Sequence, residues 1–172
     1  IFIELQIENN CLMDEHNSNS VSVKRILVAT DGSASSIRAA NFAIHLCKLE
    51  KADLVVLHVL PDIKQGGVIG LRAKYGDLKM VSAFLQAKAN EANKWIEPIQ
   101  KNAKKNGVSS KIEILENDGT SVVGIITKYA QKNQIDLIAV GTRGLSKFKR
   151  LLVGSVTSAI TSHSHCPVLL VK

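Results

Sequence analysis

Short aliphatic runs alternate with longer segments of helical period from Lys24 to the end of the chain. Runs such as Ile26-Leu27-Val28 and Leu54-Val55-Val56-Leu57 are continuous and rich in branched side chains, which is typical of strands buried on both faces. Strand patterns separated by helical patterns in this way are typical of a parallel sheet with crossover helices. The pattern therefore predicts an α/β fold.

The expected elements follow in chain order. We expect strands at about 25–30, 53–60, 111–115, 137–140 and 168–171, and helices after Ser33, at about 78–106, around 122–130 and at about 155–164. The alternating strand near 111–115 suits a sheet edge with one wet face. The segment with Gly66, Gly67, Gly70 and Gly76 is predicted to be a long loop, too rich in glycine for regular structure. Pro98 predicts a kink or break in the longest helix.

The chain of 172 residues suits a single domain, which we place at 23–172. Residues 1–22 are predicted to be a flexible N-terminal segment, because Asp14 to Ser22 is polar and rich in Asn and Ser. Their apolar positions are interrupted by charge, and there is no basic leader as in a signal peptide. Met13 is a candidate for the natural start of the protein.

The composition is globular, with 45% hydrophobic and 22% charged residues, and the net charge is +7. A net positive charge is compatible with binding to nucleic acid or to an anionic membrane, and equally with binding to a ligand that carries phosphates. Because no five-residue block is uniformly basic, nucleic acid is not favoured as a partner. No segment has the ~18 consecutive apolar residues of a membrane span, so we expect no membrane partner.

The three cysteines, Cys11, Cys47 and Cys166, are odd in number, far apart and in no C-x-x-C arrangement. Neither a disulfide framework nor a zinc site is indicated, which favours a reducing compartment and a cytoplasmic protein. We expect Cys47 and Cys166 to be small buried hydrophobes and not reactive thiols.

A glycine motif near the C-terminus carries the strongest candidate chemistry. The expected fourth strand runs into Gly141-Thr142-Arg143-Gly144, and Gly154-Ser155 opens the last helix, giving G-x-x-G-x9-G-S. Glycine at a strand end lets the backbone approach a ligand closely, and a helix N-terminus presents N–H groups and partial positive charge to an anion. Ser155 and Thr157 add hydroxyl donors in the first turn. The motif predicts a phosphate site, although glycines also end many strands for purely conformational reasons.

This motif, placed after D-L-I-A-V-G and before P-V-L-L-V, resembles the signature of ATP-binding universal stress proteins. The opening I-L-V-A-T-D-G-S and the L-H-V of the second strand match the same family, so the resemblance covers about residues 24–172. It implies a single open five-stranded parallel sheet in the order 3-2-1-4-5, with helices on both faces. Such a sheet is Rossmann-like and similar to the adenine nucleotide alpha hydrolases.

The resemblance also implies ATP across the carboxyl ends of strands one and four, with Mg²⁺ carried by the phosphates. Asp31 would contact the nucleotide near the ribose, and the backbone at Val59 would meet the adenine edge. The positions matched to ribose and phosphate contacts are Gly141, Arg143, Gly144, Gly154, Ser155 and Val156. Ala29, Thr30 and Thr157 complete the candidate site. Some members lack the glycine motif and do not bind ATP, whereas this chain keeps all of it.

Several of these residues have a plainer alternative. Asp31 before glycine is also a common capping and turn residue. Arg143, together with Lys147, Lys149 and Arg150, could neutralise phosphate charge or simply be solvated on a loop. His58 is expected to be a hydrogen-bonded core residue. His163 and His165 are two apart at a helix end, which does not suit a metal site.

The chemistry beside the glycine motif does not favour an efficient enzyme. Between Leu137 and His165 there is no Asp or Glu, and the P-loop and G-x-G-x-x-G patterns are missing from the chain. The first hypothesis is an ATP-binding stress-response or regulatory module that is not primarily an enzyme. The second is a slow ATP hydrolase or transferase that uses Asp31 through Mg²⁺. The third is an adaptor domain whose glycines only shape the backbone.

The final strand carries the expectation for assembly. Val168 to Val171 would form an aliphatic strand at the sheet edge, and an unprotected apolar edge invites pairing with another chain. We therefore expect a homodimer through this strand, which also matches the habit of the family that the chain resembles. The sequence does not identify a protein partner.

Overall fold

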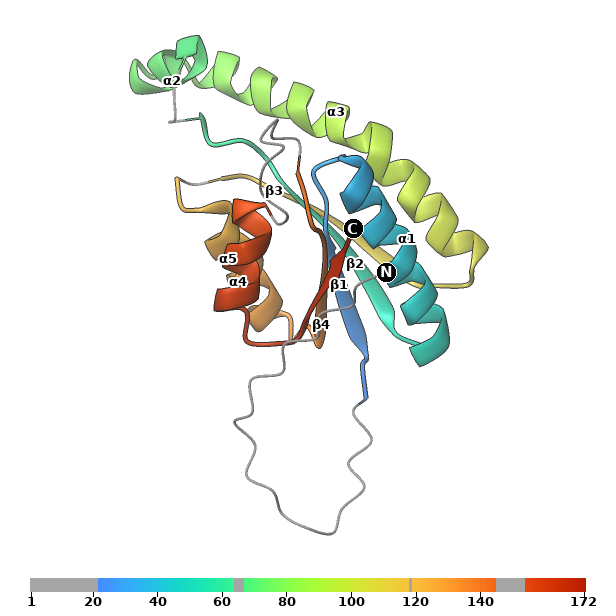
Figure 1. Ribbon diagram of the computed structural model, residues 1–172. Helices are drawn as coiled ribbons and strands as arrows, with labels where there is room; N and C mark the ends of the chain where they lie inside the picture. The colour runs from blue at the N-terminus through green and yellow to red at the C-terminus, as the bar shows by residue number, and fades with distance from the viewer. Residues whose placement is uncertain (1–21, 64–66, 118, 145–153) are drawn as a thin grey trace.

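The computed structural model describes residues 22–63, 67–117, 119–144 and 154–172. They form one sheet of five parallel strands in the order β3-β2-β1-β4-β5, which confirms the expected order (Figure 1). The strands are β1 (Arg25–Ala29), β2 (Asp53–Val59), β3 (Ser110–Leu115), β4 (Leu137–Gly141) and β5 (Val168–Val171). The helices are α1 (Ala34–Glu50), α2 (Gly67–Lys74), α3 (Leu78–Lys105), α4 (Val122–Lys132) and α5 (Ser155–His163). Apart from residue 22, the N-terminal segment lies outside the described residues, as do Lys147, Lys149 and Arg150.

Helices cover both faces of the sheet, with α1 and α3 on one face and α4 and α5 on the other (Figure 1). Successive residues of β1 point to opposite faces, as the two-residue period of a strand requires. Ile26 and Val28 join the core under α1 and α3, Leu27 joins the core under α4 and α5, and all three are fully buried. The continuous aliphatic runs therefore are strands with two dry faces, as expected.

Helix α3 continues through Pro98, so of the expected kink or break, the break does not occur. Proline removes the hydrogen bond to the carbonyl four residues back, which is that of Lys94. Both residues are exposed, so water can satisfy this carbonyl. The opposite face of the helix buries an apolar stripe that includes Leu85, Ile96 and Ile99, and this packing holds the helix together.

The segment expected to be a glycine-rich loop contains α2, so that expectation is wrong. Gly67 and Gly76 take positive φ angles, at the start of α2 and in the turn after it. Gly70 lies inside the helix, where glycine costs only about 1 kcal/mol relative to alanine. The glycine content of the segment overstated the free-energy cost of forming a helix there, because Gly67 and Gly76 lie at the ends of α2 and only Gly70 lies inside it.

The two edge strands are β3 and β5. Most of β3 is half-buried, in agreement with its alternating sequence. Leu170 and Val171 of β5 are also half-buried. Among the described residues, no helix combines the length and the apolar composition needed to cross a membrane.

Candidate functional site

A pocket opens at the carboxyl ends of β1, β2 and β4, and α4 and α5 form one of its walls. Register brings these strand ends together, because Ala29 pairs with Leu57 on one side and Val140 on the other. The predicted site residues that line the pocket are Ala29, Thr30, Asp31, Val59, Gly141, Arg143, Gly144, Val156 and Thr157. Gly154 and Ser155 are not among its lining residues and lie next to it, at the start of α5. The cavity volume is about 110 Å³. Small-molecule pockets typically hold about 300–1,000 Å³, so this one would enclose only part of a nucleotide-sized ligand.

The pocket is also lined by apolar side chains that the sequence did not assign to it: Leu57, Val122, Ile126, Val140 and Ile160. The helix expected around 122–130 carries Val122 and Ile126, but its sequence could not show that this face of α4 borders a cavity. The enclosed part of the pocket is therefore mostly apolar, which suits a flat ring. The polar groups of the glycine motif and the Asp31 loop, together with Ser36 and His58, complete the lining.

The loop after β1 is shaped by its own polar side chains. The Ser33 hydroxyl accepts the N–H of Ser36 at 3.3 Å and so caps α1. Asp31 Oδ1 accepts the N–H of Ser33 at 3.0 Å, which closes a tight turn. Gly32 between them has φ +80°, a conformation that favours glycine. Asp31 is thus the turn residue and Ser33 is the cap, and the Asp31 side chain still lines the pocket.

The same loop is tied to the glycine motif through the backbone of Arg143. The Arg143 carbonyl accepts a hydrogen bond from Ser33 Oγ at 3.2 Å and another from Ser35 Oγ. These bonds join the loop after β1 and the start of α1 to the loop after β4. The Arg143 side chain is exposed, so it can reach a ligand at the open side of the pocket.

The three glycines of the motif are required to different degrees. A Cβ at Gly141 would lie 2.6 Å from the backbone N of Ser36, so the close packing of α1 alone excludes a side chain there. A Cβ at Gly144 would lie 2.7 Å from Asp31 Oδ2. At Gly154 the nearest described atom would be 3.6 Å away, an ordinary contact, and the φ of −71° suits any residue. Packing among the described residues therefore explains Gly141 but does not explain Gly154.

Helix α5 begins at this unexplained glycine. Gly154 is the N-cap and offers no side-chain cap, in contrast to Ser33 at α1 and Ser121 at α4. The first N–H groups of any helix have no intrahelical partner and carry partial positive charge. The Thr157 hydroxyl donates to the Gly141 carbonyl at 2.8 Å, so it fastens α5 to β4 and is not the outward donor that the sequence suggested. Ser155 is exposed and keeps the role of a candidate donor.

His58 and Trp95 form the inner support of the pocket. His58 Nδ1 and the Thr30 carbonyl are 2.8 Å apart, so the ring N–H donates to that carbonyl. The two aromatic rings meet edge to face, with centroids 5.5 Å apart. The Trp95 ring in turn covers Gly32, where a Cβ would lie 2.7 Å from the indole. His58 is hydrogen-bonded, as expected, but it is half-buried and lines the pocket, so the expectation of a core residue is wrong. Its contact with Trp95 links the pocket to α3.

Groups for metal or acid–base chemistry are few among the described residues. They contain no cluster of three or more His, Cys, Asp or Glu that could hold a metal ion. Asp31 is the only carboxylate among the described residues that line the pocket. Cys47 and Cys166 lie outside it. Burial raises the pKa of Cys47 to about 12, with the nearby Asp53 charge adding to the effect, and burial also raises the pKa of Cys166.

One parallel sheet with helices on both faces and a pocket at the carboxyl ends of its strands places the chain in the class of open α/β proteins. Within that class, the universal stress protein family model matches residues 22–172, and the chain belongs to this family. Universal stress protein MJ0531 of Methanocaldococcus jannaschii is 32% identical over 172 residues, which cover 100% of this chain and 95% of the relative. Universal stress protein YxiE of Bacillus subtilis is 32% identical over 150 residues, 86% of this chain and 98% of the relative.

Solved structures show the same fold. Universal stress protein UspA from Lactobacillus plantarum has a TM-score of 0.74 and 26% identity, with 87% of this chain and 98% of that chain covered. A universal stress protein in complex with cAMP has a TM-score of 0.64 and 21% identity, over 88% and 98% of the two chains. A universal stress protein from Archaeoglobus fulgidus in complex with dAMP has a TM-score of 0.59 and 18% identity, over 88% and 99%. At these last two identities the likeness concerns the fold alone.

Proposed function

We propose that the chain binds ATP in the pocket at the carboxyl ends of β1, β2 and β4, and that occupancy regulates its contacts in a stress response. The observation that carries this proposal is the start of α5. A helix that begins beside a pocket with a glycine cap and no capping side chain leaves its first N–H groups to an anion. Gly154, which packing among the described residues does not require, keeps that approach clear.

The lining of the pocket suggests how the nucleotide lies. The adenine would enter the apolar part, with its edge at the Val59 backbone, and the ribose would lie near Asp31. The phosphates would extend over Gly141, Arg143 and Gly144 toward Gly154 and the exposed Ser155 and Val156, with Mg²⁺ held by the phosphates themselves. An apolar hollow for the base and backbone N–H groups for the anion are the two chemistries that a nucleotide needs.

Two structural neighbours support an adenine nucleotide as the ligand class. They are the proteins in complex with cAMP and with dAMP, which share this fold and whose ligands carry an adenine base. We extend the inference to ATP because this chain keeps the whole G-x-x-G-x9-G-S motif, which would hold further phosphates.

The proposed role is regulatory and not catalytic. Phosphoryl transfer needs a positioned base or water-orienting group and metal-binding carboxylates beside the phosphates. Among the described pocket residues only Asp31 is acidic, and one of its oxygens already holds the turn at Ser33. We therefore expect steady-state ATP turnover no faster than uncatalysed hydrolysis.

Asp31 also carries the second candidate function, slow ATP hydrolysis through Mg²⁺. Asp31→Asn keeps the turn acceptor and removes the charge, so it separates the two functions. If the wild type hydrolyses ATP and the variant binds ATP with no turnover, the hydrolase replaces the regulatory module as the leading function.

Gly141 gives the third candidate its support, because close packing against α1 is a sufficient reason for that glycine. In that case the chain is an adaptor domain with no nucleotide.

For either the regulatory module or the adaptor, we propose a homodimer through β5, whose apolar residues lie at a sheet edge. We also propose a protein partner, which is still to be identified.

Thermal unfolding with added ligand tests the proposal. A ligand at 100 times its Kd stabilises the folded state by about 2.7 kcal/mol, and each kcal/mol raises Tm by roughly 2–4 °C in a domain of this size. We expect Mg-ATP to raise Tm by about 5–10 °C at that ratio. Tripolyphosphate, which lacks base and ribose, should raise it much less. A Tm unchanged by millimolar Mg-ATP would contradict the proposal and favour the adaptor.

A further inference from the structure

The helix hairpin that follows β2 extends beyond the sheet (Figure 1). We call residues 67–80 the hairpin tip: α2, the turn at 75–77 and the first turn of α3. None of the described residues of α2 is buried, which sets this helix apart from the other four. The tip therefore contributes nothing to the main core and is free to contact something else.

The tip carries most of the large exposed hydrophobic residues in the described part of the chain. Its large exposed hydrophobic residues, with their exposed fractions, are Val68 (64%), Leu71 (55%), Tyr75 (77%), Leu78 (73%) and Met80 (40%). Elsewhere in the described part of the chain, only Leu49 and Val156 are large, hydrophobic and exposed. Single exposed apolar residues are normal, but a group gathered on one projecting element marks an interaction surface.

Charge at the tip indicates the kind of partner. Within the tip, three basic residues (Arg72, Lys74 and Lys79) stand against one acidic residue, Asp77. Asp77 is used locally, since its carboxylate caps α3 at the N–H of Met80 and lies 3.7 Å from Arg72. The tip therefore presents apolar side chains within a field of positive charge.

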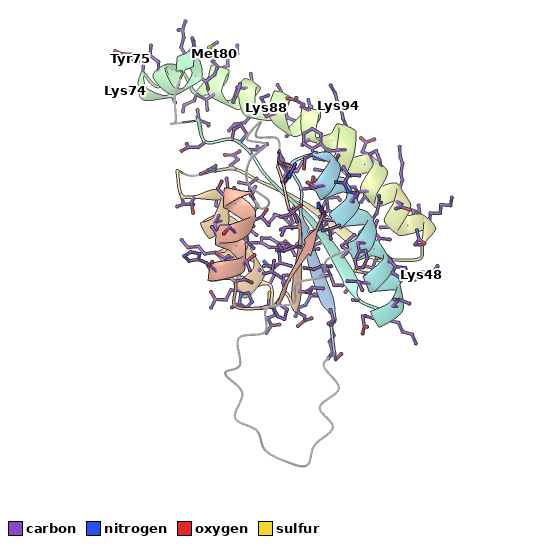
Figure 2. All side chains as sticks on the ribbon, viewed as in Figure 1. Lys48, Lys74, Tyr75, Met80, Lys88 and Lys94 are labelled. Carbon is purple, nitrogen blue, oxygen red and sulfur yellow. The ribbon has the colours of Figure 1, made fainter. Side chains whose placement is uncertain are left out.

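Figure 2 shows Lys74, Tyr75 and Met80 at the far end of the hairpin, away from the sheet. A projecting tip of this kind can enter a soft surface without a matching groove. Apolar and aromatic side chains that enter the headgroup region, with lysines beside them that reach anionic headgroups, are the usual composition of helices that lie on membranes. A symmetric contact between two tips would instead bring the same positive charges face to face.

We propose that the hairpin tip docks on a membrane surface that carries anionic lipids. Tyr75 and Leu78 enter the headgroup region, and Lys74 and Lys79 contact the lipid phosphates and carboxylates. This proposal departs from the sequence expectation of no membrane partner, which was based on the lack of a spanning segment. Because α2 was expected to be a loop, the sequence did not show this surface.

Co-sedimentation with vesicles tests the proposal on the full chain. We expect binding to vesicles of phosphatidylcholine with phosphatidylserine, weaker binding at about 0.15 M salt than at low salt, and little binding to phosphatidylcholine alone. Tyr75→Ser with Leu78→Ser should lower the partition coefficient by at least tenfold, since each side chain loses apolar burial. Lys74→Gln with Lys79→Gln should lower it by roughly fivefold for each charge.

Leu49→Ser and Lys48→Gln on α1 are matched controls, because Leu49 is 63% exposed and Lys48 lies far from the tip (Figure 2). Both controls should bind like the wild type, and circular dichroism should show every variant folded. The proposal is overturned if the folded wild type leaves anionic vesicles unbound, if neutral vesicles bind equally well, or if control and tip variants lose binding alike. Self-association that the tip variants abolish, with no vesicle binding, would assign the surface to a second copy of the chain and also overturn it.

Discussion

Replacing Gly32 with alanine should destabilise the loop that carries Asp31, for two separable reasons. The φ of +80° places alanine in the left-handed region, which costs about 1–2 kcal/mol. The new Cβ would also lie 2.7 Å from the Trp95 ring, and overpacking of this kind costs about 1–3 kcal/mol. Together they lower the free energy of unfolding by about 2–5 kcal/mol, a large share of the roughly 5–15 kcal/mol of a typical domain. We expect Tm to fall by about 4–20 °C.

Gly107→Ala separates the two contributions. Gly107 has φ +72°, and a Cβ added there would meet no described atom within 4 Å, so alanine should cost only the conformational part, about 1–2 kcal/mol. Urea unfolding followed by circular dichroism measures both variants. In a Trp95→Leu background the ring is gone, and Gly32→Ala should then cost about as much as Gly107→Ala. Equal costs for the two glycine variants in the wild-type background would refute the close packing of Trp95 on this loop.

Three further predictions concern the core, the thiols and the sheet edge. Gly141→Ala should lower the free energy of unfolding by about 1–3 kcal/mol, because the Cβ of the new alanine would meet the backbone of α1. Thermal melts measure this change, and an unchanged stability would contradict the close packing of α1 on Gly141. Cys47 should resist iodoacetamide at about pH 8 in the folded protein, because its pKa is raised to about 12 and only the thiolate reacts. Peptide mass spectrometry detects the labelling, and rapid labelling would contradict the burial of this thiol. Leu170→Asp should convert the proposed β5 dimer into a monomer in sedimentation, and a wild type that is monomeric at micromolar concentration would end the dimer proposal.

The sheet and its order could be predicted because each central strand is an unbroken aliphatic run whose neighbours are helices of clear period. Ile26, Leu27 and Val28 have no exposed surface, and burial this complete leaves a strong trace in the sequence. The start of α1 was also predictable, because a serine cap and a glycine turn depend only on residues close in the sequence.

What the sequence could not show depends on contacts between distant segments. Nothing near Gly32 indicates that Trp95, far along the chain, covers it. Likewise, the reason for Gly141 lies in α1 and not in its own strand. The helix at 67–74 was missed because it is stabilised at its ends by turn glycines and has no buried stripe, so it has none of the period that reveals α3 or α4.

The candidate site was predictable in part from the sequence. Sequence pattern located most of its residues, since the ends of β1 and β4 carry both the Asp31 turn and the glycine motif. The structure adds the apolar wall from α4 and α5, and it changes Thr157 from an outward donor into a bond between α5 and β4. It also distinguishes Gly154, the glycine without a packing reason, from Gly141.

Calorimetric titration with Mg-ATP, of the wild type and of Gly154→Val, tests the central claim most directly. The Cβ of the variant has room among the described residues and its φ is ordinary, so the variant should fold. Its side chain should nevertheless obstruct the approach of phosphate to the start of α5. We expect micromolar binding to the wild type and a loss of binding in the folded variant. No binding by either protein, or equal binding by both, would contradict a nucleotide site built on the start of α5.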